Sequence, residues 1–209
     1  PPRSTLFPYT TLFRSSVRVA SHRDSFDKGV LVVMNDEIHT ARDVVKFDSG
    51  KVDAFMSLGY GPLGIVDPDE IVYHRSTLYR ESVWTNKIDV RIDLLKAVSG
   101  FDGRLIDYCV AKGSVAVVIE AFGRGNLPKE VLPNLQNAIA QNILIVIASR
   151  TFTGRVLPEY GYDGGGKNLQ DMGAILAGDL KGTKVRLKLM ALFGKYDNPD
   201  IVKRFFVHG

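Results

Sequence analysis

Residues 115–148 read VAVVIEAFGRGNLPKEVLPNLQNAIAQNILIVIA, two short apolar runs on either side of an amphipathic stretch. The runs Val115–Ile119 and Ile143–Ala148 contain no charged residue, which is typical of strands buried on both faces of a sheet. Lys129–Gln141, which follows Pro128, has the spacing of an amphipathic helix with proline in a favoured place at its start. A strand, a helix and a second strand at this spacing predict a parallel pair joined by a right-handed crossover.

The same alternation continues on both sides of this stretch. It predicts a further strand and three further helices, at Ile88–Leu94, Asp102–Lys112, Lys184–Phe193 and residues 198–206. Glycines follow two of these helices, as is common at helix ends. We therefore expect residues 88–209 to form a complete α/β domain, with helices on both faces of a parallel sheet.

The first part of the chain has a weaker pattern. Ser16–Phe26 predicts the end of a helix, and the five apolar residues Val30–Met34 predict a parallel strand covered on both faces. Residues 37–75 contain short strand-like pieces separated by glycine and proline, and residues 76–87 are polar and aperiodic, which indicates a linker. Little sequence upstream could cover the strand at 30–34. Of two explanations, cover by the downstream strands or loss of an earlier part of the domain, we favour loss.

Residues 1–15, PPRSTLFPYTTLFRS, match residue for residue the in-frame translation of a common short-read sequencing adapter. We expect them to be an artefact and leave them out of the fold prediction. Leaving out Arg3 and Arg14 lowers the formal net charge from +4 to +2, so charge gives no reason to expect a nucleic-acid partner. The native N-terminus would then lie outside the sequence, and both the bacterial cytoplasm and the periplasm stay open as compartments.

Composition excludes several protein classes. The chain has 209 residues, 45% of them hydrophobic and 24% charged, which argues against a disordered tail, a collagen-like repeat or a disulfide-stapled miniprotein. The longest apolar run is too short to span a bilayer, so we expect no membrane partner. The single cysteine, Cys109, is expected to be a buried inert thiol, and the four histidines lack metal-ligand spacing. We expect neither a metal nor a cofactor.

Two loops have residues that could meet a ligand. In AFGRGNLP (121–128), glycines could let backbone amides approach a ligand beside Asn126, although a glycine turn with a capping asparagine explains the same residues. GYDGGGK (161–167) nearly matches a phosphate-binding loop, but Asn168 stands where the motif has Ser or Thr. A flexible loop is the favoured interpretation of the second segment.

Four segments, in this order, resemble bacterial L-asparaginases of the type II kind, a family that includes glutaminase-asparaginases. They are GVLVVMNDEIHTARDVVK (29–46), GYGPLG (59–64), EAFGRGNLP (120–128) and SRTFTGRV (149–156). The resemblance runs from about Val17 to about Phe206. It implies the remnant of an N-terminal doubly wound parallel-sheet domain at 16–75, the linker at 76–87, and a complete smaller Rossmann-like α/β domain at 88–209.

The resemblance also implies an activity and its residues. The family hydrolyses asparagine to aspartate and ammonia through a covalent acyl-enzyme on a threonine, without a cofactor. Lys46 matches the family's catalytic lysine, which would serve as the base that a weakly nucleophilic hydroxyl needs. Asn126 matches the asparagine that approaches the active site from a neighbouring subunit, which implies a homodimer or homotetramer. Glu159 or Asp163 could stand for the acidic residue that accompanies it, with L-asparagine or L-glutamine as substrate.

The sequence departs from the family pattern at the nucleophile. Neither Thr-Gly-Gly-Thr nor His-Gly-Thr-Asp occurs in it, so we expect this chain by itself to be inactive. Two alternatives stay open. One is the related amidotransferase subunit that supplies ammonia to a tRNA-linked substrate, and the other is a non-catalytic α/β module for dimerisation or ligand sensing.

Overall fold

The computed structural model describes residues 8–78 and 80–206, with only the backbone given for 8–12. The chain divides into two compact units, unit 1 at Pro1–Ser82 and unit 2 at Val83–Gly209. In the described ranges, no helix combines the length and the apolar character needed to cross a membrane.

Unit 2 is built on a four-stranded parallel sheet in which the spatial order of the strands follows their order in the chain. Its strands are β7 (Ile92–Lys96), β8 (Ala116–Ala121), β9 (Leu144–Ser149) and β10 (Ile175–Leu176). Every pairing is parallel. The predicted α/β class and the parallel arrangement of this part are therefore confirmed.

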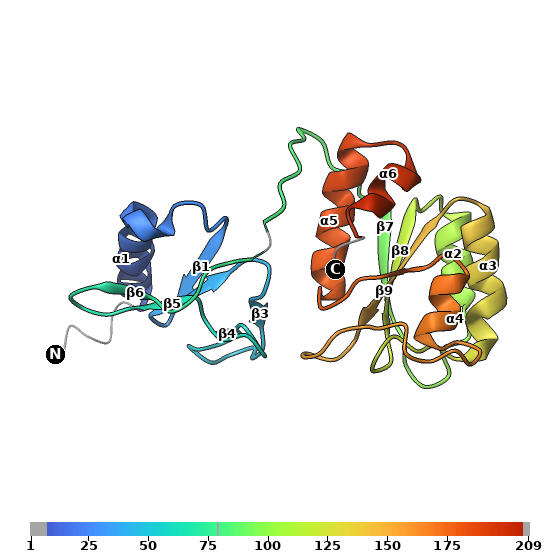
Figure 1. Cartoon of the computed structure of the whole chain (residues 1–209), viewed down its shortest axis with the longest axis horizontal. Helices are drawn as coiled ribbons and strands as arrows, with labels where there is room; N and C mark the ends of the chain where they lie inside the picture. The colour runs from blue at the N-terminus through green and yellow to red at the C-terminus, as the bar shows by residue number, and fades with distance from the viewer. Residues whose placement is uncertain (1–7, 79, 207–209) are drawn as a thin grey trace. The chain divides into compact units, whose positions relative to one another are not determined.

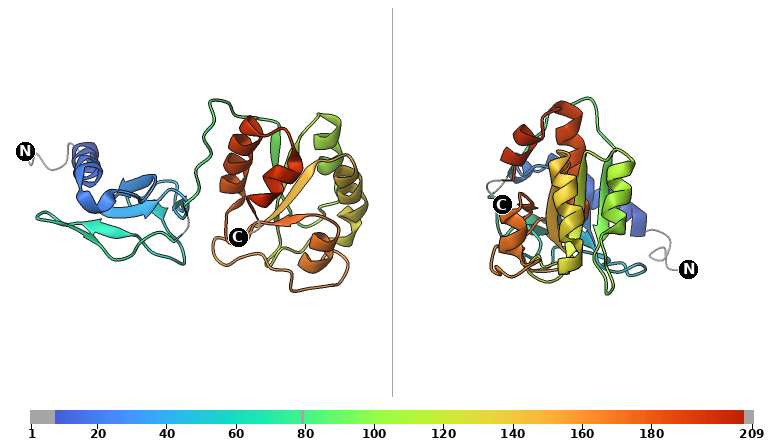
Figure 2. Two further views of the ribbon diagram at one scale, coloured as in Figure 1. Left: turned by 45° about the horizontal axis from the view of Figure 1, so that its top comes forward. Right: turned by 90° about the vertical axis from the view of Figure 1, so that its right-hand side faces the viewer.

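Helices cover both faces of this sheet (Figures 1 and 2). They are α2 (Arg104–Ala111), η3 (Lys129–Val131) with α3 (Leu132–Ala140), α4 (Gly166–Asp171), α5 (Gly182–Lys195) and α6 (Pro199–Arg204). The first core cluster contains residues of α2, α3 and α4, and the second contains residues of α5 and α6. Consecutive right-handed crossovers place α2, α3 and α4 on one face, and α5 returns across the other.

Residue alternation along β8 explains why its sequence is apolar without interruption. Val117 and Ile119 belong to the core cluster of α2 and α3, whereas Ala116 and Val118 belong to that of α5, and all four are fully buried. A strand covered on both faces has no solvent-facing positions for polar side chains.

The glycine run at 164–166 is packed tightly, which contradicts the flexible loop that we predicted. Gly164 has a φ of +86°, and a Cβ atom there would overlap the carbonyl oxygen of Leu127. A Cβ on Gly166, the first residue of α4, would overlap the carbonyl oxygen of Leu157. The glycines therefore permit close backbone approach within the protein.

Unit 1 has an antiparallel sheet. Its elements are α1 (Pro8–Ser21), η2 (Arg23–Ser25), β1 (Leu31–Met34), β2 (Glu37–Thr40), β5 (Gly64–Val66) and β6 (Ile71–Tyr73), with the strands in the order β1-β2-β5-β6. Two further strands, β3 (Val45–Lys46) and β4 (Phe55–Met56), form a separate ladder. A small core of Val19, Ile38 and Val66 joins α1 to the larger sheet.

The parallel pairing predicted for Val30–Met34 is wrong in this structure. Leu31–Met34 pairs antiparallel with Glu37–Thr40, and its residues are half-buried. The physical reason is the connecting turn, because Asn35 and Asp36 both adopt positive φ angles, +51° and +57°. Two such residues form the tight turn that reverses a chain into a hairpin, and asparagine and aspartate tolerate that conformation well. The described strands of unit 1 therefore include none of a parallel sheet.

The boundaries at the start of the chain and at the linker differ in what they show. Helix α1 begins at Pro8, upstream of the expected start at Ser16, and the Ser15 hydroxyl donates to the Asp36 carboxylate at 3.3 Å. The origin of residues 1–15 stays a prediction, and residues 1–7 lie outside the described ranges. The described residues of 76–87 form no helix or strand, as a linker would.

Candidate functional site

A turn at the carboxyl end of β8 holds Asn126. The backbones of Phe122 and Asn126 exchange hydrogen bonds of 3.0 and 2.9 Å, which close the turn. Gly123 and Gly125 have positive φ angles of 46° and 106°, a conformation that side chains disfavour. Ligands of open parallel sheets bind outside the carboxyl ends of the strands, where this turn lies.

The side chain of Asn126 has an unused acceptor. Its Oδ1 atom is buried, and the residues that the structure describes supply no hydrogen-bond partner for it. A buried polar atom without a partner is costly, and such atoms in native proteins often mark a place that a ligand or water fills. Asn126 is thus the described residue of unit 2 with the clearest capacity to accept a hydrogen bond from a ligand.

The structure brings the loop at 150–165 alongside this turn. The Leu157 amide donates to the Arg124 carbonyl at 3.0 Å, and the Leu127 amide donates to the Gly164 carbonyl at 2.8 Å. Asn126 lies between two of these bonded residues. The two carboxylates suggested by sequence therefore stand on a loop that is bonded directly to the turn.

The two acidic residues differ in their surroundings. Glu159 forms an ion pair with Arg124, with Nε 3.2 Å from Oε2, and both side chains are about half exposed. Asp163 is exposed and directly precedes the tightly packed Gly164. Arg124 neutralises part of the Glu159 charge, whereas the Asp163 carboxylate faces solvent.

Two hydroxyls that the sequence analysis did not single out support the turn. Ser149, at the end of β9, donates to the Gly123 carbonyl at 2.7 Å and lies 2.8 Å from the Thr151 hydroxyl. The Arg150 guanidinium lies 4.3 Å from the Phe122 ring centroid. Their place directly after a predicted buried strand was the signal that could have identified them.

Lys46 lies in unit 1, on the hairpin formed by β3 and β4. It is exposed, it pairs with Phe55 across the ladder, and its Nζ atom lies 5.8 Å from the Phe55 ring centroid. Asp48 follows it, and hydrogen bonds from the Gly50 and Lys51 amides lower the pKa of the Asp48 carboxyl. Lys46 therefore stands on a hairpin with a carboxylate nearby that stays ionised.

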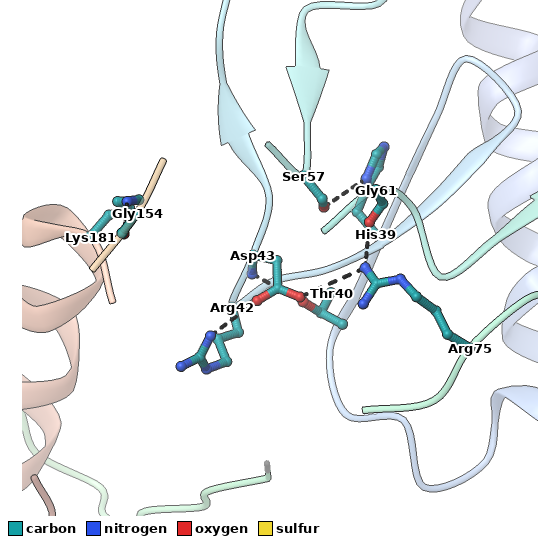
Figure 3. A network of polar contacts seen from close by, with 9 residues as sticks. All are labelled: His39, Thr40, Arg42, Asp43, Ser57, Gly61, Arg75, Gly154 and Lys181. Atoms are coloured by element: carbon teal, nitrogen blue, oxygen red, sulfur yellow. Dashed lines mark hydrogen bonds and ion pairs between the residues drawn. The ribbon is translucent and has the colours of Figure 1, made fainter. Parts of the chain in front are cut away.

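A polar network lies at the base of this hairpin (Figure 3). His39 is hydrogen-bonded through Nδ1 to the Ser57 hydroxyl at 2.9 Å, and the Asp43 amide donates to the Thr40 hydroxyl at 3.0 Å. Arg75 donates to the carbonyl of Pro62 at 2.9 Å and to that of Gly61. The sequence analysis did not identify this network, because its members are far apart along the chain.

Other titratable groups carry less functional meaning. Cys109 is buried, and burial together with Asp93 raises the pKa of its thiol to about 11, as expected for an inert cysteine. At the start of α5, burial lowers the pKa of Lys181, whose amine donates to the Gly154 carbonyl at 3.3 Å. Within residues 8–78 and 80–206, no group of three or more His, Cys, Asp or Glu side chains could hold a metal ion.

Comparison with known proteins identifies both units. Residues 91–206 match the family model described as glutaminase/asparaginase C-terminal domain, and residues 12–79 match the model described as asparaginase, N-terminal. The first of these models alone covers more than half of the chain.

Curated relatives agree with the family models. An L-asparaginase of Bacillus licheniformis is 31% identical over 90% of this chain and 58% of its own length. A probable L-asparaginase of Deinococcus radiodurans is 34% identical over 93% of this chain and 60% of its own. A glutamyl-tRNA(Gln) amidotransferase subunit of Methanococcus vannielii is 30% identical over 84% and 44%. The chain therefore spans about half the length of the curated relatives that it matches.

Proposed function

The chain belongs to the glutaminase/asparaginase family, and from this we propose that it supplies two parts of an amidohydrolase site that converts L-asparagine to L-aspartate and ammonia. The observation that carries this proposal is the buried, unpaired Oδ1 of Asn126 at the carboxyl end of β8. An amino-acid substrate carries an ammonium group whose N–H bonds could satisfy that acceptor.

Lys46 is the proposed base. Hydrolysis begins when a hydroxyl oxygen attacks the amide carbon, and the leaving nitrogen takes up protons and departs as ammonia. Water then cleaves the resulting ester and releases aspartate. A threonine hydroxyl is a weak nucleophile at neutral pH, so an amine positioned to accept its proton accelerates the first step. We propose that this hydroxyl comes from a part of the enzyme outside this chain, whose sequence contains neither threonine motif.

Asn126 is proposed to act across the interface of a homodimer or homotetramer, with an acidic residue beside it. A carboxylate next to Asn126 would pair with the substrate ammonium, and both Glu159 and Asp163 are placed on the adjoining loop. Asp163 has the more available charge, since Arg124 holds the Glu159 carboxylate. Comparison of Glu159→Gln with Asp163→Asn in an active enzyme separates them, because loss of the ammonium partner should raise KM for asparagine.

A second candidate function rests on the archaeal relative. Its identity to this chain, 30%, is nearly that of the Bacillus asparaginase, 31%. An ammonia-supplying subunit would use the same residues to release ammonia from glutamine, and would need a partner protein to receive it. The two candidates differ in whether free asparagine is hydrolysed without a partner.

The test joins this chain to the part of the Bacillus licheniformis asparaginase that precedes the matched region. We expect the hybrid to release ammonia from asparagine, and the Lys46→Ala hybrid to lose that activity by orders of magnitude. Lys51→Ala is the matched control, because Lys51 is an exposed lysine on the same hairpin.

Three results would count against the proposal. A folded hybrid that releases ammonia from neither asparagine nor glutamine would overturn the hydrolase assignment. Equal rates in the Lys46→Ala and Lys51→Ala hybrids would remove the role of Lys46. Ammonia release by the 209-residue chain alone, above its own Lys46→Ala control, would contradict the proposed external nucleophile.

A further inference from the structure

The hairpin that carries Lys46 cannot hold its own position. Its ladder has two residue pairs, Val45 with Met56 and Lys46 with Phe55. Within residues 45–56 Ala54 alone is buried. Isolated two-stranded hairpins are marginal in water, and one this short lacks the apolar contacts that could fix its direction. Its placement therefore depends on contacts at its base.

Both ends of the hairpin meet at Arg75. The chain enters through the turn at 41–44, where a carboxylate oxygen of Asp43 lies 4.0 Å from Nη2 of Arg75. The chain leaves through residues 57–62, where the carbonyls of Gly61 and Pro62 accept hydrogen bonds from the same guanidinium. Figure 3 shows Arg75 reaching Asp43 on one side and Gly61 on the other.

The two ends are themselves ordered locally. Asp43 and Val44 donate backbone N–H groups to the carbonyl of Thr40, and the Asp43 side chain is only 12% exposed. At the other end, the Tyr60 and Gly61 amides both donate to the Ser57 carbonyl. Each end is thus a compact turn, and a single side chain can hold the pair together.

The backbone of Arg75 is also anchored. The amides of His74 and Arg75 donate to the carbonyl of Leu63, at 2.8 and 3.3 Å, and the Leu63 amide donates to Ile38 of β2 at 2.6 Å. Leu63 and Ile38 are fully buried. The guanidinium therefore extends from the most rigid part of unit 1 toward the least supported part.

We propose that Arg75 is a positioning residue that fixes the direction of Lys46 by clamping both ends of its hairpin. The catalytic meaning of this placement rests on the function proposed for Lys46, but the clamp itself does not. A guanidinium offers several N–H donors in a fixed plane, so it can serve two carbonyls and a carboxylate together. A lysine amine at the same place would be a single flexible point of contact.

The direct test is hydrogen exchange of the Phe47 amide in the 209-residue chain. Phe47 follows Lys46, and its N–H donates to the Ala54 carbonyl at 2.7 Å, so it is protected only while the hairpin is closed. We expect Arg75→Met to speed its exchange about tenfold or more, because charge-assisted hydrogen bonds to both ends are lost. Arg75→Lys should give a smaller acceleration.

The control is Arg18→Met. Arg18 also donates from its side chain to a backbone carbonyl of unit 1, that of Asp67 at 2.8 Å, but it makes this contact at the turn between β5 and β6. We expect it to leave exchange at Phe47 unchanged. Amides of the β5–β6 ladder report whether unit 1 as a whole has been destabilised.

The outcomes are decisive in both directions. Unchanged protection of Phe47 in Arg75→Met would overturn the clamp, as would equal acceleration of Phe47 and the β5–β6 ladder in a folded variant. If Arg75→Met unfolds unit 1, Arg75→Lys decides, and normal Phe47 exchange there would overturn the proposal.

In the active hybrid, Arg75→Met should lower kcat more than it changes KM, and Arg75→Lys should restore part of the loss. If Lys46→Ala leaves the hybrid active, the proposed function fails for Lys46, while the exchange result still tests the clamp.

Discussion

The imidazole of His39 is hydrogen-bonded through Nδ1 to the hydroxyl of Ser57 at 2.9 Å, with the two residues 1% and 4% exposed. This contact joins β2 to the residue that follows β4. The other ring nitrogen lies 3.2 Å from a carboxylate oxygen of Glu37. Burial lowers the pKa of His39 below its usual 6.5, although Glu37 opposes that effect, and Arg75 adds to it.

The lowered pKa predicts that unit 1 loses stability in mild acid. The unfolded chain binds a proton to this histidine near its ordinary pKa of 6.5, whereas the folded chain resists protonation until lower pH. Stability should therefore be level above that value and fall as the pH drops below it. Urea unfolding of unit 1 at a series of pH values measures the effect. In His39→Gln this part of the pH dependence should disappear, and an unchanged slope would show that another group is responsible.

Helix α5 offers a matched pair of leucines for testing the core of unit 2. Leu189 is fully buried against the sheet, while Leu187, two residues away, is 59% exposed. Leu189→Ala should lower the free energy of unfolding by about 2–5 kcal/mol through lost burial and a residual cavity. Leu187→Ala should change it by no more than about 0.5 kcal/mol. Denaturant titration compares them, and similar losses would mean that α5 packs differently.

The glycine run allows a similar comparison at the candidate site. Gly164→Ala should destabilise unit 2 by about 1–3 kcal/mol, because a Cβ at a positive φ is strained and would meet the Leu127 carbonyl. Gly161→Ala, in the same loop with open space around it, should be nearly neutral. Thermal melting of the two variants gives the difference. Equal melting temperatures would argue that the loop does not pack on the turn as described.

Asn126 should contribute more to function than to stability. Removing a buried acceptor that has no partner also removes its desolvation cost, so Asn126→Ala should unfold within about 0.5 kcal/mol of the parent chain. In the hybrid enzyme the same change should weaken asparagine turnover. A large loss of stability would instead mean that Asn126 is a structural residue of the turn.

Local sequence patterns predict unit 2 well, because its strands and helices are long enough to show their periodicity. They do not predict helix α4, since six residues that begin with glycine show little helical periodicity. The strand at 30–34 is misassigned to a parallel sheet because apolar content does not reveal the partner strand. The turn at Asn35 and Asp36 is the deciding local signal.

The candidate site was predictable only in part. Asn126 follows a strand that the sequence marks clearly, so its place at the edge of the sheet could be anticipated. The contact between Arg75 and Asp43 joins residues separated by 32 positions, and no local pattern connects them. Whether Lys46 acts as a base stays a prediction, as do the roles of Glu159 and Asp163.

The strands of unit 2 lie side by side in the order in which they are synthesised. Nucleotide-binding domains of the doubly wound kind reverse direction midway, and the gap between the diverging loops forms a natural crevice for a ligand. Without such a reversal, the rim of this sheet offers a shelf with a single wall. A small polar molecule resting on it would stay open to water until another protein surface closed over it, which makes enclosure a property of assembly.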